Sequence, residues 1–307
     1  MKSKLCHELL GLQPARSEVK DLYSWYVAYC VINALLSVTA IMFNSVTIHA
    51  LRRTSSLSKP LKTLLMSLAI SDLGVGLLVH PLCIVLLITF LQPDPKGGPS
   101  CSIYTAFSLS GILFSSASFF GVMALSADQF LAIQVHLRYN ELVTHKYVVS
   151  LVISVCFLCA TFFPLKVLAS STISDAVFAF IGIVCLILSG MFYCKIYLTV
   201  IRHQKQIKVQ QPVNGEMVTN FARGKKSAVC TFYVYLVFLI CYLPLLCIFA
   251  VSPDSGRLNA TFKISAVSSW TLVFLNSSIN PLIYCWKIKH VRRAVISILR
   301  NLSATHI

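Results

Sequence analysis

The sequence predicts an all-α membrane protein folded as a seven-transmembrane helix bundle. Of the 307 residues, 57% are hydrophobic and only 12% are charged, which is too apolar for an ordinary soluble domain. Seven apolar stretches each reach the roughly 20 residues that a membrane-spanning helix needs. Lys and Arg gather between alternate stretches. The lipid bilayer is therefore the first expected partner of this chain.

The seven expected spans follow one another with short connections. They cover residues 26–50, 62–91, 102–135, 148–170, 173–201, 227–251 and 263–286. The fourth and fifth stretches are nearly continuous. We separate them because Pro164, Lys166 and Asp175 belong to a polar cluster there, and because the combined block is too long for one crossing.

The distribution of Lys and Arg predicts the orientation in the membrane. An odd number of spans puts the chain ends on opposite faces, and Lys/Arg-rich loops remain cytoplasmic. One face holds 17 of the 26 Lys and Arg residues, in segments 51–62, 135–147, 202–226 and 287–307. We therefore expect a multi-pass plasma-membrane protein with its N-terminus extracellular and its C-terminus cytoplasmic. The net charge of +16 comes mostly from Lys and Arg residues at the expected cytoplasmic face. We interpret these residues as a surface that attracts anionic lipid and not as a nucleic-acid site.

Three regions result from this topology. Residues 1–25 form an extracellular N-terminal segment, 26–286 the transmembrane domain, and 287–307 a juxtamembrane helix with a short cytoplasmic tail. In the last region apolar residues recur at helical spacing among Lys and Arg, which is typical of an amphipathic helix lying on the inner leaflet. Among the twelve cysteines only Cys6 and Cys101 fall in the outer, oxidising compartment, so a Cys6–Cys101 disulfide is a hypothesis.

Asp72 is the only acidic residue in the second span. A carboxylate at this depth is costly unless it is hydrated, protonated or paired. One interpretation is a protonated Asp72 bonded to a neighbouring helix. The other is a hydrated cation or proton site whose oxygen ligands come from Asn44, Ser118, Asn276, Ser277 and Asn280. That set has no second charge, so it suits a weakly held monovalent cation better than a divalent metal.

The last span carries a proline beside asparagines, in the run Asn276-Ser277-Ser278-Ile279-Asn280-Pro281-Leu282-Ile283-Tyr284. Pro281 removes a backbone hydrogen bond and predicts a kink. Asparagines inside a membrane are costly unless they have partners or a task. The run therefore predicts a moving part in the seventh helix.

Four motifs in order resemble those of the rhodopsin-like (class A) G-protein-coupled receptors. Asn44 resembles the family's single Asn of helix one, and Leu68-Ala69-Ile70-Ser71-Asp72 its Leu-Ala-x-x-Asp. Asn280-Pro281-Leu282-Ile283-Tyr284 is similar to its Asn-Pro-x-x-Tyr, and Tyr193 to its inner tyrosine of helix five. The resemblance implies a receptor whose helix six moves outward to engage a heterotrimeric G protein. It also implies a sodium-type site, with Na⁺ as an allosteric ion, at Asp72, Ser118, Asn276, Ser277 and Asn280.

The switch residues diverge from the family at two places. Asp128-Gln129-Phe130 stands where the family has Asp-Arg-Tyr, so the usual charge pair between helices three and six cannot form. Cys241-Tyr242-Leu243-Pro244 resembles Cys-Trp-x-Pro, and Pro244 predicts a kink. The resemblance implies activation switches at Asn44, Asp128, Gln129, Tyr193, Tyr242, Pro244, Asn280, Pro281 and Tyr284.

A mostly aromatic pocket is implied in the outer half of the bundle, as in many small-molecule sites. Its expected residues are His80, Phe107, Ser108, Gly111, Ile112, Ser115, Tyr242, Leu245, Phe249, Trp270 and Phe274. Gly111 stands where amine receptors carry an aspartate, and Phe274 where opsins carry the retinal lysine. We therefore expect a small, non-amine extracellular ligand. Lys166 and Asp175 are interpreted as solvated residues of the rim, with ligand contact as the alternative.

Two other classes of function remain open. Gln129 is compatible with a weakly coupling receptor-like binder or a dimer partner, and Asp72 with an ion-pathway or transport protein. An enzyme is the least expected class, because no His/Asp/Glu metal set and no paired carboxylates stand at one depth. We accordingly predict no catalytic residues, no metal ligands and no organic cofactor.

Overall fold

The computed structural model describes Leu9 and residues 11–54, 57–92, 101–134, 139–168, 171–209, 235–251, 258–287, 292–293 and 295–297. All regular structure within these ranges is helical. The prediction of an all-α protein is therefore confirmed.

The helices occupy the positions of the seven expected spans. They are α2 (Arg16–Arg53), α3 (Lys59–Gly74), η1 (Val75–Val79), α4 (His80–Leu91), α5 (Cys101–Gln134), α6 (Tyr139–Leu142), α7 (His145–Leu168), α8 (Ser171–Val209) and α10 (Ala260–Lys287). A further helix, which carries no label, covers Tyr235–Val251. The elements α3, η1 and α4 form one continuous span, and α7 and α8 are separate helices, as expected.

The described helices differ in how apolar they are. Four are long and apolar enough to cross a membrane, at Ser17–Arg53, Lys59–Leu91, Cys101–Ala132 and Ile173–Thr199. His145–Thr161 and Tyr235–Val251 are shorter apolar helices. The α10 helix is not in either group, and its many Ser, Thr and Asn residues explain its lower hydropathy. These polar residues face other helices, as described below.

The first helix begins at Arg16, earlier than the expected boundary at residue 26. Glu18 explains this early start. Its carboxylate accepts a hydrogen bond from the backbone N–H of Ala15 at 2.9 Å, and a negative charge in the first turn favours a helix N-terminus. The helix therefore extends into part of the predicted N-terminal segment.

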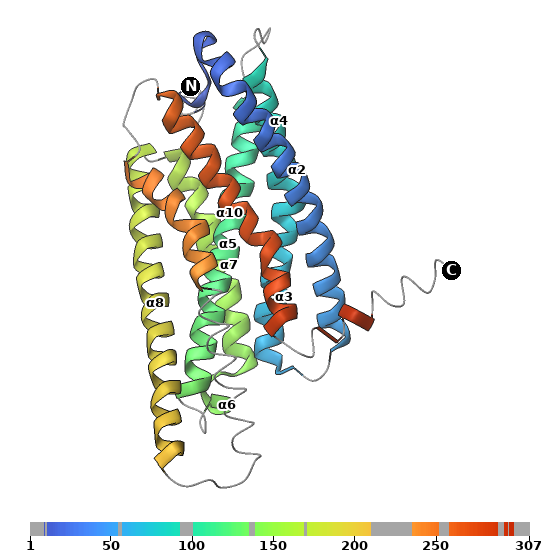
Figure 1. Cartoon of the computed structure of the whole chain (residues 1–307), viewed down its shortest axis with the longest axis vertical. Helices are drawn as coiled ribbons and strands as arrows, with labels where there is room; N and C mark the ends of the chain where they lie inside the picture. The colour runs from blue at the N-terminus through green and yellow to red at the C-terminus, as the bar shows by residue number, and fades with distance from the viewer. Residues whose placement is uncertain are drawn as a thin grey trace, which may run out of the picture.

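The bundle is elongated, with helices running roughly along its length (Figure 1). The long helix α8 lies along one edge and α2 along the opposite edge, while α10 runs between them. The α2 helix packs mainly against α4 and α10, and α5 packs against α3, α7 and α8. Residues of α5, α8 and α10 line one cavity, which is described below.

The faces of α2 reverse the pattern of a soluble helix. Asn33, Ser37 and Asn44 are buried, whereas Leu35 and Met42 are among its exposed apolar side chains. Apolar side chains on the outside cost nothing in lipid, and polar side chains can instead hydrogen-bond between helices. This face of α2 is therefore specified by hydrogen bonds more than by apolar burial.

The second span contains one π-helical turn, η1, immediately before His80 and Pro81. Proline has no N–H to donate and its ring clashes with the carbonyl four residues earlier. A π turn re-spaces the backbone at such a point and is often found at functional sites. Asp72 precedes this turn in the chain and His80 follows it. The turn therefore changes the direction in which the His80 side chain points relative to that of Asp72.

The C-terminal prediction lies largely outside the described residues. Arg292, Arg293 and residues 295–297 are helical, and Val295 packs against the main apolar core. The full amphipathic helix over 287–307 stays a prediction.

Candidate functional site

A cavity of about 170 Å³ lies between α5, α8, helix 235–251 and α10. Ten of the eleven expected pocket residues line it: Phe107, Ser108, Gly111, Ile112, Ser115, Tyr242, Leu245, Phe249, Trp270 and Phe274. The structure adds Tyr104, Ser116, Phe119, Phe120, Asp175, Phe178, Ile181, Gly182, Leu246 and Val273. Most of the added residues come from α8 and α5. The residues of α8 were missed because nothing in the sequence indicated which face of this helix points into the cavity.

Nine of the twenty residues that line the cavity are aromatic. Phe107 packs edge-on against Trp270 at 5.1 Å between ring centroids and against Phe274 at 6.2 Å. Phe178 and Phe249 face each other from α8 and helix 235–251 at 6.2 Å. Rings in such tilted and edge-on arrangements attract one another beyond simple burial. The wall is therefore rigid and apolar, which suits a small molecule with an apolar body.

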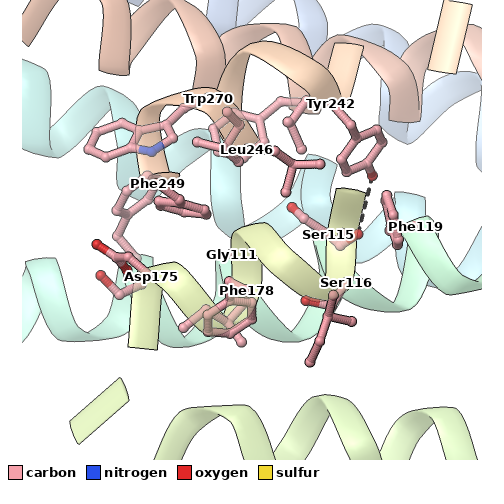
Figure 2. A pocket seen from close by; sticks show the side chains of 18 of the residues that line it. Gly111, Ser115, Ser116, Phe119, Asp175, Phe178, Tyr242, Leu246, Phe249 and Trp270 are labelled. Carbon is pink, nitrogen blue, oxygen red and sulfur yellow. Dashed lines mark hydrogen bonds between the residues drawn. The ribbon is translucent and has the colours of Figure 1, made fainter. Parts of the chain in front are cut away.

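Tyr242 closes the inner end of the cavity. Its ring packs on Phe119 at 5.0 Å and on Phe238 at 4.6 Å. Its hydroxyl donates a hydrogen bond to the backbone carbonyl of Ser115 at 3.2 Å, which Figure 2 shows as a dashed line. The Ser115 hydroxyl is itself buried and has no hydrogen-bond partner among the described residues. The inner end thus offers one unused polar group.

His80 does not line the cavity, contrary to its predicted place there. The π turn before it turns the side chain toward α2, where Nδ1 donates to the Asn33 amide oxygen at 3.0 Å. Its ring meets the Phe274 ring edge-on at 5.4 Å between centroids. His80 therefore supports the back of a wall residue and does not face the ligand space.

Asp175 is not a solvated rim residue. It lies near the start of α8, only 6% of its surface is exposed, and it lines the cavity. Figure 2 shows it at the end of the cavity where Phe249 and Trp270 lie. The interpretation as a rim residue failed because the polar cluster around it forms the first turns of α8 and not a loop. The side chain of Lys166 is outside the described residues.

Asp72 lies at the centre of a buried polar cluster on the inner side of the cavity. It is completely buried, and its carboxylate accepts hydrogen bonds from Ser118 at 2.8 Å and from Asn280 at 2.9 Å. Ser277 lies close enough to interact with it as well. The structure therefore brings together four of the five residues expected for a sodium-type site, from α3, α5 and α10.

The fifth expected residue, Asn276, lies buried with its amide nitrogen unpartnered among the described residues. The amide oxygen of Asn44 is also buried without such a partner, although its nitrogen donates to the carbonyls of Ala40 and Ser277 at 2.9 and 3.0 Å. Unpaired buried polar atoms usually mark the place of water or an ion. The residues around Asp72 thus have spare hydrogen-bonding capacity beside a buried carboxylate.

A row of hydrogen bonds joins α2 to α10, and we call it the polar seam. It consists of Tyr29, Asn33, Thr39 and Asn44 on α2 with Ser268, Thr271, Ser277 and Ser278 on α10. Tyr29 bonds to Ser268, Asn33 donates to Thr271 at 3.1 Å, Thr39 donates to Ser278 at 3.2 Å, and Asn44 joins Ser277 as above. Sequence reasoning found only Asn44 and Ser277 of these residues.

The outer ends of the same two helices are joined by an ion pair. The Lys263 ammonium lies 2.7 Å from a carboxylate oxygen of Glu18. Only 1% of the Lys263 side chain is exposed, against 26% for Glu18. Sequence analysis did not identify this pair, because the two residues are far apart in the chain and its only signal was their shared position at outer span ends.

The inner switch residues form separate contacts. The hydroxyls of Tyr193 and Ser126 are 2.6 Å apart, which joins α8 to α5. The Tyr139 hydroxyl of α6 donates to Asp128 at 2.6 Å. Burial and this contact with an acid raise the pKa of Tyr139 above its usual value, so its hydroxyl stays protonated and able to donate.

For the remaining predicted switch residues, the structure shows the helix and the burial but few contacts. Gln129 lies half-buried on α5 and Pro244 half-buried in helix 235–251, while Pro281 is buried within α10. The Tyr284 side chain lies outside the described residues. Cys101 is disulfide-bonded, and none of the nine cysteines described as free is its partner. Cys6 is outside the described residues, so the Cys6–Cys101 pairing stays a prediction.

Comparisons with known proteins agree with this architecture. The family model described as "7 transmembrane receptor (rhodopsin family)" matches residues 43–176 and 157–284. The chain is 24% identical to adenosine receptor A3 of Ovis aries, over 90% of this chain and 91% of that receptor. It is 26% identical to adenosine receptor A2b of Gallus gallus, over 86% of each. It is 24% identical to adenosine receptor A2a of Canis lupus familiaris, over 91% of this chain and 73% of that receptor.

Proposed function

The chain belongs to the rhodopsin family of seven-transmembrane receptors, and from this premise we propose how it acts as a G-protein-coupled receptor. A small extracellular ligand enters the aromatic cavity. Helices six and seven, which are helix 235–251 and α10, then rearrange and present the inner face to a heterotrimeric G protein. The absence of a carboxylate at Gly111 argues against an amine held in the way that amine receptors hold it.

One observation carries the proposal: Tyr242 links the cavity to the buried polar cluster. It lines the cavity, and its hydroxyl donates to the backbone carbonyl of Ser115, one turn of α5 before Ser118, which donates to Asp72. Tyr242 stands two residues before Pro244 in a helix that can bend there. A ligand that displaces the Tyr242 ring therefore also disturbs the hydrogen bonds around Asp72.

The charge distribution supports the proposed orientation. Most Lys and Arg residues lie in segments that alternate with the outer loops, and such segments remain in the cytoplasm. The cavity then opens toward the extracellular side of the plasma membrane. Asp128, Gln129 and Tyr193 lie at the cytoplasmic end, where the G protein binds.

Reconstitution tests this function directly. The full chain is placed in lipid nanodiscs with a panel of heterotrimeric G proteins, and nucleotide exchange is measured for the wild type, Gln129→Arg and Tyr284→Ala. We expect measurable basal exchange in the wild type, more in Gln129→Arg because an arginine restores a cationic contact for the G protein, and less in Tyr284→Ala. If neither the wild type nor Gln129→Arg promotes exchange on any G protein, the signalling proposal is wrong.

A receptor-like binder with weak coupling is the second candidate. It is favoured by one observation, the neutral Gln129 in place of an arginine. In that case only Gln129→Arg promotes exchange. The ion-pathway alternative is not favoured, because Asp72 is buried and already hydrogen-bonded to Ser118 and Asn280.

We also propose that the Asp72 cluster binds Na⁺ and that the ion stabilises the resting form. Asp72 supplies the negative charge, while Ser118, Ser277, Asn276 and Asn280 supply neutral oxygens after their side chains rotate. The unpaired amide groups of Asn44 and Asn276 support this fit, because they leave hydrogen-bonding capacity for water beside the ion. A single carboxylate among neutral oxygens suits a weakly held monovalent ion.

Thermal unfolding in different salts tests the ion site. We expect the melting temperature of the wild type to be higher in NaCl than in N-methylglucamine chloride of equal ionic strength, because a ligand that binds only the folded state stabilises it by about 1–3 kcal/mol at 10–100 times its Kd. Asp72→Asn should remove the difference. Asp21→Asn, which neutralises an exposed carboxylate of α2, should retain it. Equal melting temperatures for the wild type in the two salts would contradict the proposal.

A further inference from the structure

We propose that Asp175 makes the cavity selective for small aromatic cations, with the positively charged nitrogen at Asp175 and the apolar body against the aromatic wall. This inference rests on the proposed ligand-binding role of the cavity and adds the chemical class of the ligand. The expectation of a non-amine ligand rested on the missing carboxylate at Gly111 of α5. It therefore applies to an amine held at Gly111, and it does not apply to an amine held by a carboxylate on α8.

The first step of the argument is the burial of Asp175. A carboxylate that is 6% exposed has lost most of its water, and a buried charge is tolerated only with compensating partners. Asp175 already interacts with another part of the chain. Its position in the cavity lining leaves it in addition accessible to a ligand group, which joins or replaces that internal contact.

The second step is the set of rings around Asp175. Phe178 stands one helical turn along α8, and it faces Phe249 at 6.2 Å between ring centroids. Figure 2 shows Asp175, Phe249 and Trp270 at the same end of the cavity. Ring faces attract cations, and a carboxylate among aromatic rings is a common way to bind an ammonium group. An anionic ligand meets repulsion from Asp175 and gains nothing from the ring faces.

The third step concerns the part of the cavity around Gly111, which lies between Asp175 and the end formed by Ser115 and Tyr242 (Figure 2). A Cβ atom placed at Gly111 has a single neighbour within 4 Å, Val79 Cγ1 at 3.9 Å. Helix α5 therefore contributes open space beside Ile112 and Phe107 and no charge. The cavity therefore has a charged part and an apolar part. Its carboxylate comes from α8, and the region near Gly111 accepts an apolar group. A ligand with charge at one end and a ring at the other matches this arrangement.

Binding of matched probes tests the inference. The probes are tryptamine, its neutral counterpart 3-propylindole and the anionic indole-3-propionate, with the corresponding phenyl series. Dissociation constants are measured by calorimetry and saturation-transfer NMR on the purified full chain in nanodiscs without G protein. We expect the wild type to bind the amines at least about tenfold more tightly than the neutral probes, as for other buried charge contacts. Asp175→Asn should reduce this ratio to about one, whereas Asp175→Glu should keep part of it.

A control variant isolates the direct contact. Asp21→Asn removes an exposed carboxylate that does not line the cavity, so it reports any effect of overall charge. It should keep the preference for amines, and melting curves without probe check that each variant is folded.

Three results would overturn the inference: no binding of the amines to the wild type, equal or tighter binding of the neutral or anionic probes, or an unchanged preference in a folded Asp175→Asn variant. If Asp175→Asn does not fold, the comparison of probes on the wild type and Asp175→Glu still decides. None of these measurements uses nucleotide exchange. A receptor that signals but prefers neutral probes therefore refutes only this inference, and a chain that binds amines without signalling refutes only the coupling proposal.

Discussion

The polar seam between α2 and α10 and the cavity between α5, α8 and α10 place their polar groups in opposite ways. In the seam, hydroxyl and amide side chains pair directly across two helices. In the cavity, aromatic rings predominate, and a buried serine hydroxyl has no partner among the described residues. Lipid does not drive apolar helix faces together, so hydrogen bonds and close packing must define the seam. The cavity leaves polar capacity for a ligand to use.

This difference suggests that the seam and the cavity have different roles in the bundle. The seam, which ends at Ser278 on α10, acts as the fixed part, because each seam contact would have to be broken in the membrane, where no water replaces it. The part of α10 from Pro281 onward lies beyond the seam and can rearrange with helix 235–251. The α5–α8 side and helix 235–251 carry the cavity and the bendable Pro244. We therefore expect substitutions in the seam to change stability, and substitutions around the cavity to change binding or signalling.

Two glycines offer the sharpest test of this comparison. A Cβ atom added at Gly76, next to the seam, would lie 2.9 Å from Ile41 Cγ1 and 3.2 Å from the backbone nitrogen of Ile41. We expect Gly76→Ala to cost about 1–3 kcal/mol, because α2 must move away, and to weaken the 2.8 Å bond from Ser37 to the Gly76 carbonyl.

Gly111→Ala is the matched control for Gly76→Ala. Its added methyl group meets only Val79 at 3.9 Å, and alanine is favoured over glycine in a helix by about 1 kcal/mol. The expected result is a lower melting temperature for Gly76→Ala and an unchanged or higher one for Gly111→Ala. Similar melting temperatures for the two variants would mean that α2, the helix that carries the seam, is not packed more tightly against η1 than the wall of the cavity is packed at Gly111.

The Asn33–His80 contact gives the next largest expected effect. Asn33 donates to the Tyr29 carbonyl at 2.8 Å and to Thr271, and it accepts from His80. Asn33→Leu leaves the His80 Nδ1 group buried without that partner, at a cost of about 1–3 kcal/mol.

A double-mutant cycle tells whether the effect of Asn33→Leu comes from pairing. If the lost pair is the cause, Asn33→Leu with His80→Leu should be less destabilised than the sum of the two single variants, by at least about 0.5 kcal/mol. The measurement is the melting temperature in nanodiscs. Strict additivity would show that the contact with His80 does not stabilise the bundle, and that the effect of Asn33→Leu comes from its other contacts.

Much of this architecture could be predicted from the sequence, because membrane spans are governed by length and hydropathy. Asp72, Asn280 and Ser118 could be grouped because each is costly in a membrane and matches a family motif. The partners of Asn33 could not be found in this way, since hydroxyls that pair between helices are common and depend on helix rotation. A signal was present, however: Tyr29, Asn33 and Ser37 recur every four residues within an apolar span, which indicates one polar helix face.

Asp175 and His80 were misplaced for a local structural reason in each case. Asp175 was placed at the outer start of the fifth span and interpreted as a solvated rim residue, but it is buried on α8 and lines the cavity. His80 was assigned to the cavity through the resemblance to the receptor family. The π turn at Val75–Val79 stands directly before it, and a π turn has no dependable sequence signal.

The smallest expected change in stability concerns the bond between Ser126 and Tyr193, which joins two helices of the cavity side at their inner ends. One hydrogen bond of this kind contributes about 0.5–1.5 kcal/mol. Because the charge pair between helices three and six is absent, this bond is a candidate restraint on the resting form. We expect Ser126→Ala to change the melting temperature little and to raise basal nucleotide exchange, since it releases Tyr193 while leaving its hydroxyl in place.

Tyr193→Phe is the control that separates a restraint from a general loosening of the inner end. It breaks the same bond and also removes the hydroxyl expected to approach Tyr284 in the active form, so exchange should stay at or below the wild-type level. Opposite effects of these two variants would show that the helices around the cavity are held by contacts weak enough for a ligand to overcome, in contrast to the seam. An equal rise in both would mean that Tyr193 has no role in the active form, and no change in either would exclude this bond as the restraint.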